Sequence, residues 1–266
     1  MIIDFHTHIF PEKLVDRAMQ VLIKNGGNIV PQAKATQSGL LGYMDTHNID
    51  RSVVLNIATN AKQQTNVNNF AAEINSERII AFGSVYPKAE NAIDELYRIK
   101  ELGLKGIKLH PDYQEFYVDD PAMAKIYETA VALGLIVVFH SGVDVEYYEP
   151  VHCTPKRLAD ALEAFKGGTV VAAHFGGYLQ LYEVEEHLVG KSVYFDTSFS
   201  YSRVPRLHAK KIILNHGADK ILFGSDMPWS GTHLEKLFIE SMDLDPADFD
   251  AIMYKNAARL LNLHIN

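Results

Sequence analysis

The stretch Ile2-Ile3-Asp4-Phe5-His6-Thr7-His8 opens the chain with an apolar run that ends in two histidines. Because side chains alternate along a strand, His6 and His8 are expected on the same side of it. Two neutral imidazoles at a strand end suit a divalent metal ion. A single His-x-His pair is weak evidence for a metal site, because two histidines on a surface strand are common. Further evidence must come from the rest of the chain.

Three later apolar runs end in the same way, each with a residue that can bind a metal ion or move a proton. They are Val137-Val138-Phe139-His140, Val170-Val171-Ala172-Ala173-His174 and Ile221-Leu222-Phe223-Gly224-Ser225-Asp226. Four such endings in one chain are difficult to attribute to chance. The pattern therefore indicates a site assembled from the ends of several strands.

Short runs rich in Val, Ile and Phe recur along the whole chain, mostly about 25 to 35 residues apart, with helical patterning between them. They cover residues 2–6, 52–57, 79–85, 106–110, 135–140, 169–174, 192–196 and 221–225. Near-continuous apolar strands are typical of a parallel sheet that helices cover. We therefore predict an α/β fold, with a single (β/α)8 TIM-barrel domain over residues 1–266.

The sequence shows capping signals at the ends of two connecting helices. Asp120 before Pro121 supplies an N-cap and a first-turn proline, and Gly134 ends the apolar stripe that follows. Thr154 before Pro155 opens the next helix in the same way. We expect both helices to lie outside the barrel.

The interval between the first two strands is about twice as long as the others. It contains Asn25-Gly26-Gly27-Asn28 and the polar stretch from Pro31 to Gly39, which is typical of a loop rather than a helix. Long loops in compact domains often cover sites. A lid and a passive surface loop are both consistent with this pattern.

Composition points to a small-molecule partner. The formal net charge is −8 at pH 7, which argues against an electrostatic grip on nucleic acid or on an anionic membrane. The one cysteine, Cys153, cannot form an intramolecular disulfide and is read as a small buried apolar residue. Because no leader or membrane span is recognisable, we expect a soluble cytoplasmic protein, with a homodimer as the commonest assembly.

Barrel enzymes place their chemistry at the carboxyl ends of the strands. The polar residues that end the predicted strands are His6, His8, His110, His140, His174 and Asp226. A barrel would bring these residues to one mouth, although they are far apart in sequence. This is what a catalytic metal ion needs, namely several fixed protein ligands and one position for water or substrate.

With these residues in place, the chain resembles the amidohydrolase superfamily, in particular the branch of aminocarboxymuconate and resorcylate-type decarboxylases and related lactonases. The resemblance spans nearly the whole chain. Its motifs are Ile3-Asp4-Phe5-His6-Thr7-His8, the stretch from Met44 to Leu55, Gly106-Ile107-Lys108-Leu109-His110-Pro111, Phe139-His140, Ala173-His174-Phe175-Gly176-Gly177, Phe223-Gly224-Ser225-Asp226-Met227-Pro228-Trp229 and Asn256-Ala257-Ala258-Arg259-Leu260-Leu261.

The resemblance implies a metal-dependent hydrolase type of barrel in which His6, His8, His140 and Asp226 bind the metal ion. It also implies that His174 lies close to the substrate and polarises it. Nitrogen ligands with one carboxylate favour one divalent ion, Zn²⁺ first, with Mn²⁺ or Fe²⁺ as alternatives. Asp226 is the expected proton carrier, because a carboxylate beside a metal-bound water can take its proton and return it.

Four other residues are candidates for substrate contact. Lys108 and His110 share one face of their strand, and the lysine could pair with a substrate carboxylate. In some superfamily members a carboxylated lysine on this strand bridges two metal ions, but the offset of Lys108 from His110 favours a single ion. His110 could also be a weaker ligand or a buried hydrogen-bonded histidine. Arg203 could bind a substrate carboxylate through two parallel hydrogen bonds. Trp229 follows the last strand, where it could contact the substrate.

The remaining histidines have no partner that the sequence identifies, and most are expected to be solvated or structural. They are His47, His152, His187, His208, His216, His233 and His264.

Three functions remain open at this point. The first is hydrolysis of an amide, ester or lactone bond by a metal-activated water. The second is nonoxidative decarboxylation of a small aromatic or muconate-like carboxylic acid on the same ligands. The third is a binding protein that keeps the metal without turnover, although a structural site would usually close its coordination shell.

Overall fold

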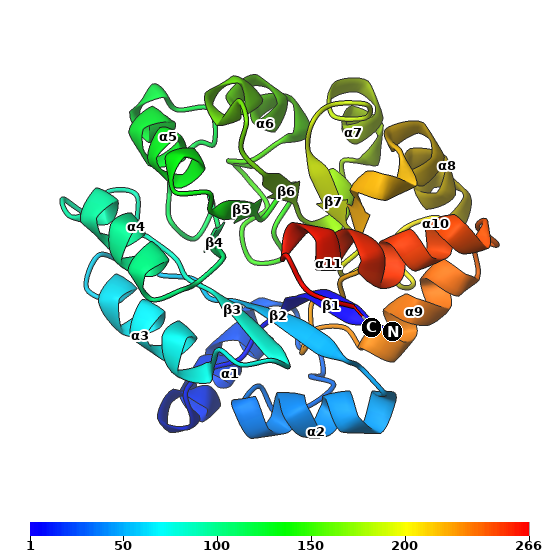
Figure 1. The fold of residues 1–266 in the computed structure, drawn as a ribbon, viewed down its shortest axis with the longest axis horizontal. Helices are drawn as coiled ribbons and strands as arrows, with labels where there is room; N and C mark the ends of the chain where they lie inside the picture. The colour runs from blue at the N-terminus through cyan, green and yellow to red at the C-terminus, as the bar shows by residue number, and fades with distance from the viewer. Residues whose placement is uncertain (266) are drawn as a thin grey trace. The chain divides into compact units, whose positions relative to one another are not determined.

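The computed structural model describes residues 1–265, and strands alternate with helices along them (Figure 1). Among the described residues each of the eight predicted strand segments overlaps one strand, and β1 and β2 each extend one residue beyond the predicted segment. The strands are β1 (Ile3–Thr7), β2 (Arg51–Leu55), β3 (Ile79–Phe82), β4 (Gly106–Leu109), β5 (Ile136–Phe139), β6 (Val170–Ala172), β7 (Tyr194–Asp196) and β8 (Ile221–Leu222). The strands are almost entirely buried, as the apolar runs predict for a parallel sheet.

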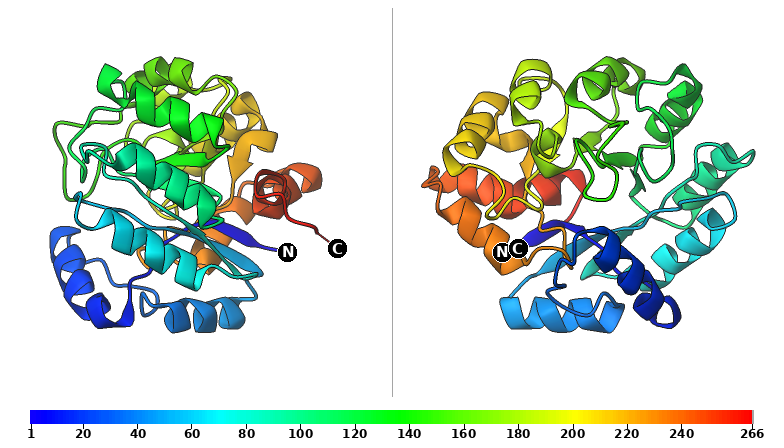
Figure 2. Two further views of the ribbon diagram at one scale, coloured as in Figure 1. Left: turned by 60° about the vertical axis from the view of Figure 1, so that its left-hand side comes forward. Right: turned by 180° about the vertical axis from the view of Figure 1, so that it is seen from behind.

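Helices follow every strand. They are α1 (Glu12–Asn25), α2 (Gln37–His47), α3 (Gln64–Ile74), α4 (Ala92–Glu101), α5 (Ala124–Ala132), α6 (Pro155–Ala161), α7 (Leu181–His187), α8 (Arg206–His216), α9 (Thr232–Glu240), α10 (Pro246–Asp250) and α11 (Asn256–Leu260). Neighbouring helices pack in sequence order, with α3 against α4 and α4 against α5 (Figure 2). Among the described helices, none is long and apolar enough to cross a membrane.

The chain forms two compact units. Unit 1 consists of Met1–Val54, Glu77–Ile79 and the chain from Asp196 to its end. Unit 2 consists of Leu55–Ser76 and Ile80–Phe195.

In unit 1, β1 lies between β2 and the segment that contains β8. It pairs in parallel with β2, with Ile3 opposite Arg51. On its other side the Phe5 N–H donates to the Phe223 carbonyl at 2.8 Å, and the Asp226 N–H donates to the His6 carbonyl at 2.8 Å. This contact places the end of β1 directly beside the loop that follows β8.

In unit 2, strands β4 to β7 pair in parallel and in sequence order. The end of β3 joins β4, because the Gly83 N–H donates to the Gly106 carbonyl at 2.9 Å. Within unit 2 the strands from β3 to β7 therefore follow the order of the sequence, and within unit 1 the segment after β8 neighbours β1. This is the strand order of a (β/α)8 barrel, as predicted.

The local signals at two helix starts are confirmed. The Asp120 side chain accepts from the Ala122 N–H, and Thr154 accepts from the Arg157 N–H at the start of α6. The prediction of a loop as far as Gly39 is wrong at its end, since α2 begins at Gln37. There the Thr36 hydroxyl caps the helix by accepting from the Gly39 N–H at 3.1 Å.

Candidate metal centre and catalytic residues

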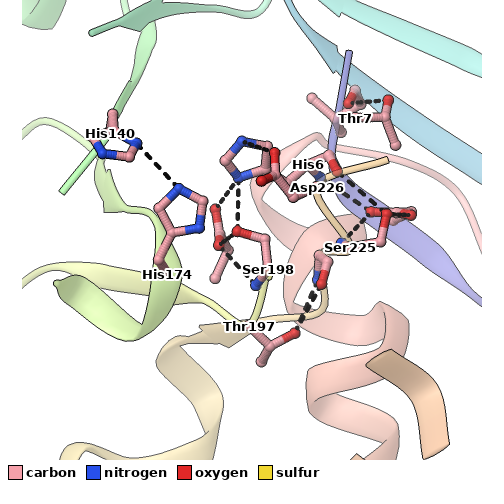
Figure 3. Close-up of polar contacts among 12 residues, drawn as sticks. His6, Thr7, His140, His174, Thr197, Ser198, Ser225 and Asp226 are labelled. Carbon is pink, nitrogen blue, oxygen red and sulfur yellow. Dashed lines mark hydrogen bonds and ion pairs between the residues drawn. The ribbon is translucent and has the colours of Figure 1, made fainter. Parts of the chain in front are cut away.

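Three donor atoms converge at the end of β1 in unit 1. His6 Nε2 lies 3.1 Å from His8 Nε2, and Asp226 Oδ1 lies 3.4 Å from His6 Nε2 and 3.2 Å from His8 Nε2. His6 is 1% exposed and Asp226 is 8% exposed. The structure thus brings together three of the four predicted metal ligands, and Figure 3 labels two of them, His6 and Asp226.

A buried carboxylate, Asp4, holds this arrangement together. It accepts from the Ser225 N–H at 2.9 Å, from the Ser225 hydroxyl at 2.6 Å and from the Thr232 hydroxyl at 2.7 Å. It also accepts from the His6 N–H at 3.2 Å. Burial raises the pKa of Asp4 to about 6, while these hydrogen bonds lower it. Through Ser225, Asp4 fixes the next residue, Asp226, whose backbone has a φ of 71° that non-glycine residues rarely adopt.

The other ring nitrogen of His6 contacts residues at the end of β7. Its Nδ1 lies 2.8 Å from Asp196 Oδ2 and 3.0 Å from the Ser198 hydroxyl (Figure 3). Asp196 is fully buried. Sequence reasoning did not select this carboxylate. Its signal was present, because Val193-Tyr194-Phe195-Asp196 is another apolar run that ends in a metal-compatible residue.

The chemistry of this donor set fits a divalent cation. Around a tetrahedral ion, donors at about 2.1 Å lie about 3.4 Å from one another, close to the separations seen here. Three buried carboxyl groups of unit 1 lie at or beside this point, those of Asp4, Asp196 and Asp226. Within the described residues of unit 1 no lysine or arginine is buried. Buried carboxylates without a compensating charge are costly, so a cation at this point would stabilise them.

In unit 2, His140 places its two ring nitrogens in different environments. Its Nδ1 lies 3.2 Å from His174 Nε2 (Figure 3). Its Nε2 is buried, has no hydrogen-bond partner in the described part of the chain, and lies 3.8 Å from Asp144 Oδ2. Burial, and next the charges of His110 and His174, hold the pKa of His140 well below its ordinary value. A neutral imidazole is the form that binds a metal ion.

The surroundings of His110 settle which ring nitrogen carries its proton. The Tyr113 N–H donates to Nδ1 at 3.3 Å, so in the neutral imidazole the proton is on Nε2. That nitrogen lies 3.4 Å from Asp144 Oδ2. The ring also stacks on Tyr113, with centroids 3.8 Å apart. His110, His140 and Asp144 each place one donor atom within 4.8 Å of the others, so the hydrogen-bonded and the weaker-ligand interpretations of His110 both stay predictions. Asp144 is a residue that sequence reasoning missed.

The remaining candidates differ in what they contact. Lys108 is buried on β4, and its charge helps to lower the pKa of His140. Arg203 lies over the Phe199 ring at 3.7 Å and donates to the Tyr201 carbonyl. Trp229 is partly buried against the apolar face of α1. Substrate contact by Arg203 and Trp229 therefore stays a prediction.

Three of the histidines without an assigned partner, His47, His152 and His233, have one in the structure. His152 Nδ1 lies 2.8 Å from Asp112 Oδ1, which also accepts from the His152 N–H. In unit 1, His47 stacks on His233 with ring centroids 4.6 Å apart. The sequence could not show these contacts, because each pair is distant along the chain. Cys153 is buried, as predicted, and burial raises the pKa of its thiol to about 12.

A model of the amidohydrolase family matches residues 3–263. The chain belongs to the amidohydrolase family. The family model extends over nearly all of the sequence, so the predicted resemblance is confirmed. No curated protein sequence matches this amidohydrolase significantly.

Solved structures show the same fold at low sequence identity. A 5-carboxyvanillate decarboxylase from Sphingomonas paucimobilis has a TM-score of 0.77 and 16% identity, with 99% of each chain covered. A dihydroxybenzoic acid decarboxylase from a Polaromonas species, solved with manganese and 2-nitroresorcinol, has a TM-score of 0.76 and 19% identity, covering 100% of this chain and 98% of that one. A putative amidohydrolase from Staphylococcus aureus has a TM-score of 0.72 and 17% identity, with 98% and 99% covered.

This amidohydrolase therefore brings three donors that suit a cation together in unit 1, and two buried histidines, His140 and His174, together in unit 2. The first can bind and polarise an oxygen ligand once a cation is present. The second can accept or donate a proton. That His140 completes the shell of His6, His8 and Asp226 stays a prediction.

Proposed function

We propose that this amidohydrolase is a metal-dependent, nonoxidative decarboxylase of a small hydroxylated aromatic carboxylic acid. The observation that carries the proposal is the convergence of His6 Nε2, His8 Nε2 and Asp226 Oδ1 within 3.4 Å of one another. Such a partial shell leaves positions for substrate oxygens. Structures of the same fold that act on carboxylated phenols, by their names, add support.

The proposed roles of the residues are as follows. A divalent cation, when bound, supplies positive charge that holds the carboxylate or an adjacent hydroxyl of the substrate. His6, His8, His140 and Asp226 would hold that cation, and Zn²⁺ and Mn²⁺ are both compatible with nitrogen and carboxylate donors. Lys108, with its positive charge, would pair with the acid, and Arg203 and Trp229 would line the substrate.

Proton transfer is assigned to Asp226, with His174 beside the substrate. The acid form of Asp226 gives its proton to the ring carbon that bears the carboxylate. The bond between that carbon and the carboxylate then breaks, its electron pair returns to the ring, and CO₂ leaves. One proton is consumed for each CO₂ released, so general acid catalysis is the main task of the side chains.

A second candidate function is hydrolysis of an amide, ester or lactone bond. The family to which the chain belongs is named for this reaction, and the same three donors can activate a water molecule. In that reaction Asp226 would accept the proton of the water and return it to the leaving group.

One experiment separates the two functions. Protein loaded with Zn²⁺ or Mn²⁺ is incubated with 2,6-dihydroxybenzoate and 5-carboxyvanillate, and in parallel with a panel of lactones and amides. We expect CO₂ and the decarboxylated phenol from at least one acid. Turnover of lactones or amides alone, with the acids unchanged, would overturn the proposal in favour of hydrolysis.

We also propose that the enzyme acts on its small molecule in the cytoplasm, as a homodimer. The net charge of −8 and the single, buried cysteine support a reducing compartment without nucleic-acid partners.

A further inference from the structure

We propose that Asp196 is a positioning residue of the metal centre, which together with Ser198 fixes the proton of His6 on Nδ1 and so keeps Nε2 available as a ligand. The inference rests on the proposed metal site. It does not depend on which reaction the enzyme catalyses.

The hydrogen bonds around His6 determine where its proton lies. Asp196 Oδ2 can only accept, and it is 2.8 Å from His6 Nδ1. The Ser198 hydroxyl donates to Asp196 Oδ1, as the Ser198 N–H also does at 3.1 Å. With its proton used in this way, the Ser198 oxygen can only accept from His6 Nδ1, at 3.0 Å. Both neighbours of Nδ1 are therefore acceptors, and Nδ1 carries the proton.

The consequence appears on the opposite edge of the ring. With the proton on Nδ1, the lone pair of His6 Nε2 points toward His8 Nε2 and Asp226 Oδ1, at 3.1 and 3.4 Å. A carboxylate that accepts from the remote ring nitrogen also increases the basicity of the ligating one. Asp196 is thus proposed to act on the ligand atom of His6 from the opposite edge of the ring.

The backbone around Asp196 is built to keep it in this position. The Thr197 N–H donates to the Leu222 carbonyl at 3.0 Å, and the Thr197 hydroxyl and the Gly224 N–H are 3.1 Å apart. A Cβ atom on Gly224 would lie 3.0 Å from the His6 Cβ and 3.5 Å from the Asp196 Cβ. The glycine therefore provides the space in which these two side chains meet.

The same carboxylate could instead serve only to stabilise the fold, so the test needs a direct reading of the tautomer. Metal-free protein labelled with ¹⁵N in its histidines is examined by NMR, and the His6 signals are assigned with the His6→Asn variant. We expect His6 to be protonated on Nδ1 in the native chain. In Asp196→Asn the amide can donate or accept, so we expect a mixture of tautomers. A native His6 protonated on Nε2 would overturn the inference.

Metal affinity is the second readout. Competition of Zn²⁺ and Mn²⁺ with a chromophoric chelator should show a 10- to 100-fold weaker Kd in Asp196→Asn, roughly the range for lost outer-shell partners. Glu235→Gln is the matched control, because Glu235 is another buried carboxyl, bound to the same loop through the Ser200 N–H. We expect its affinity and its His6 tautomer to be native.

The outcomes separate this inference from the proposed function. Equal metal affinities in Asp196→Asn and the native protein would overturn the positioning role, whatever the substrate. If Asp196→Asn does not fold, the His6 tautomer of the native protein decides by itself, because protonation on Nδ1 supports the inference and protonation on Nε2 overturns it. Weakened binding in a protein that decarboxylates no acid would support the inference and overturn the proposed function.

Discussion

The metal centre depends on three side chains whose acceptor atoms lie unusually close together. His6, His8 and Asp226 come within 3.4 Å of one another, while Asp4 and Asp196 hold them from behind. Three lone-pair donors at such separations repel one another unless a proton or a cation lies between them. The hydrogen bonds of Asp4 and Asp196 to His6 constrain this geometry, and a cation between the three donors would remove their repulsion.

The first prediction concerns Asp226, the proposed ligand and proton carrier. In Asp226→Asn we expect metal affinity to fall by at least about 10-fold, and turnover by about 10² to 10⁴, the usual contribution of a general acid. Isothermal titration with Mn²⁺ and a CO₂ release assay measure the two effects. The exposed Asp243→Asn serves as the control, since Asp243 also has a positive φ. Native turnover in Asp226→Asn would exclude the assigned role.

The second prediction concerns Glu235. Burial raises the pKa of its carboxyl to about 8, from an ordinary value of 4.5, although hydrogen bonds from Ser230, Tyr201 and Ser200 lower it. Between pH 4.5 and about pH 8 the folded chain keeps a proton on Glu235 that the unfolded chain has released. The free energy of unfolding therefore falls by about 1.4 kcal/mol for each pH unit in this range.

Glu235→Gln mimics the protonated acid and should remove this dependence. We expect the free energy of unfolding of the native protein to fall relative to the variant between about pH 5 and about pH 8. Urea denaturation at several pH values measures it. Parallel pH curves for the two proteins would contradict the raised pKa.

Among the elements, the ends of β1 and β7 come close to Gly224, which follows β8. A Cβ atom added to Gly224 would lie 3.0 Å from the Cβ of His6 and 3.5 Å from that of Asp196. In Gly224→Ala we therefore expect His6 to be displaced, metal affinity to fall about 10-fold, and stability to fall by about 1 to 3 kcal/mol. Chelator competition and thermal unfolding report the two quantities.

Gly42→Ala is the control for that substitution. Gly42 lies within α2, and a Cβ atom added there would meet nothing within 4 Å. Alanine in a helix should stabilise the protein by up to about 1 kcal/mol and leave the metal affinity unchanged. If Gly224→Ala behaved in the same way, the close packing at the strand ends would not matter for the metal.

The elements themselves could be predicted from sequence because their signals are local. Each of the eight apolar runs overlaps a strand, and Asp120 and Thr154 cap the helices that they were expected to open. The start of α2 was missed, since a polar run with glycine can also form a helix once Thr36 caps it.

The partners in the site were much less predictable than the elements. Ring orientation depends on which acceptor lies beside the second nitrogen, and that neighbour comes from a distant segment. Asp196 is 190 positions from His6, and Asp112 is 40 positions from His152. Alternation along a strand gives the side on which a histidine lies, but not its tautomer. The same limit applies to His110, whose Nδ1 accepts from the Tyr113 N–H.

At the scale of the whole molecule, the linkage between metal binding and stability gives the last prediction. A ligand that binds only the folded state stabilises it by about 2.7 kcal/mol when it is present at 100 times its Kd. For a chain of this size each kcal/mol raises the Tm by about 2 to 4 °C. We therefore expect Zn²⁺ or Mn²⁺ to raise the Tm by about 5 to 10 °C, and a chelator to reverse the shift. In Asp226→Asn, whose metal affinity is expected to be at least about 10-fold weaker, the same metal concentration should raise the Tm by about half as much or less, and in Asp243→Asn the shift should stay native. A Tm that does not respond to any divalent ion would mean that the converging His6, His8 and Asp226 donors are held together by protons alone.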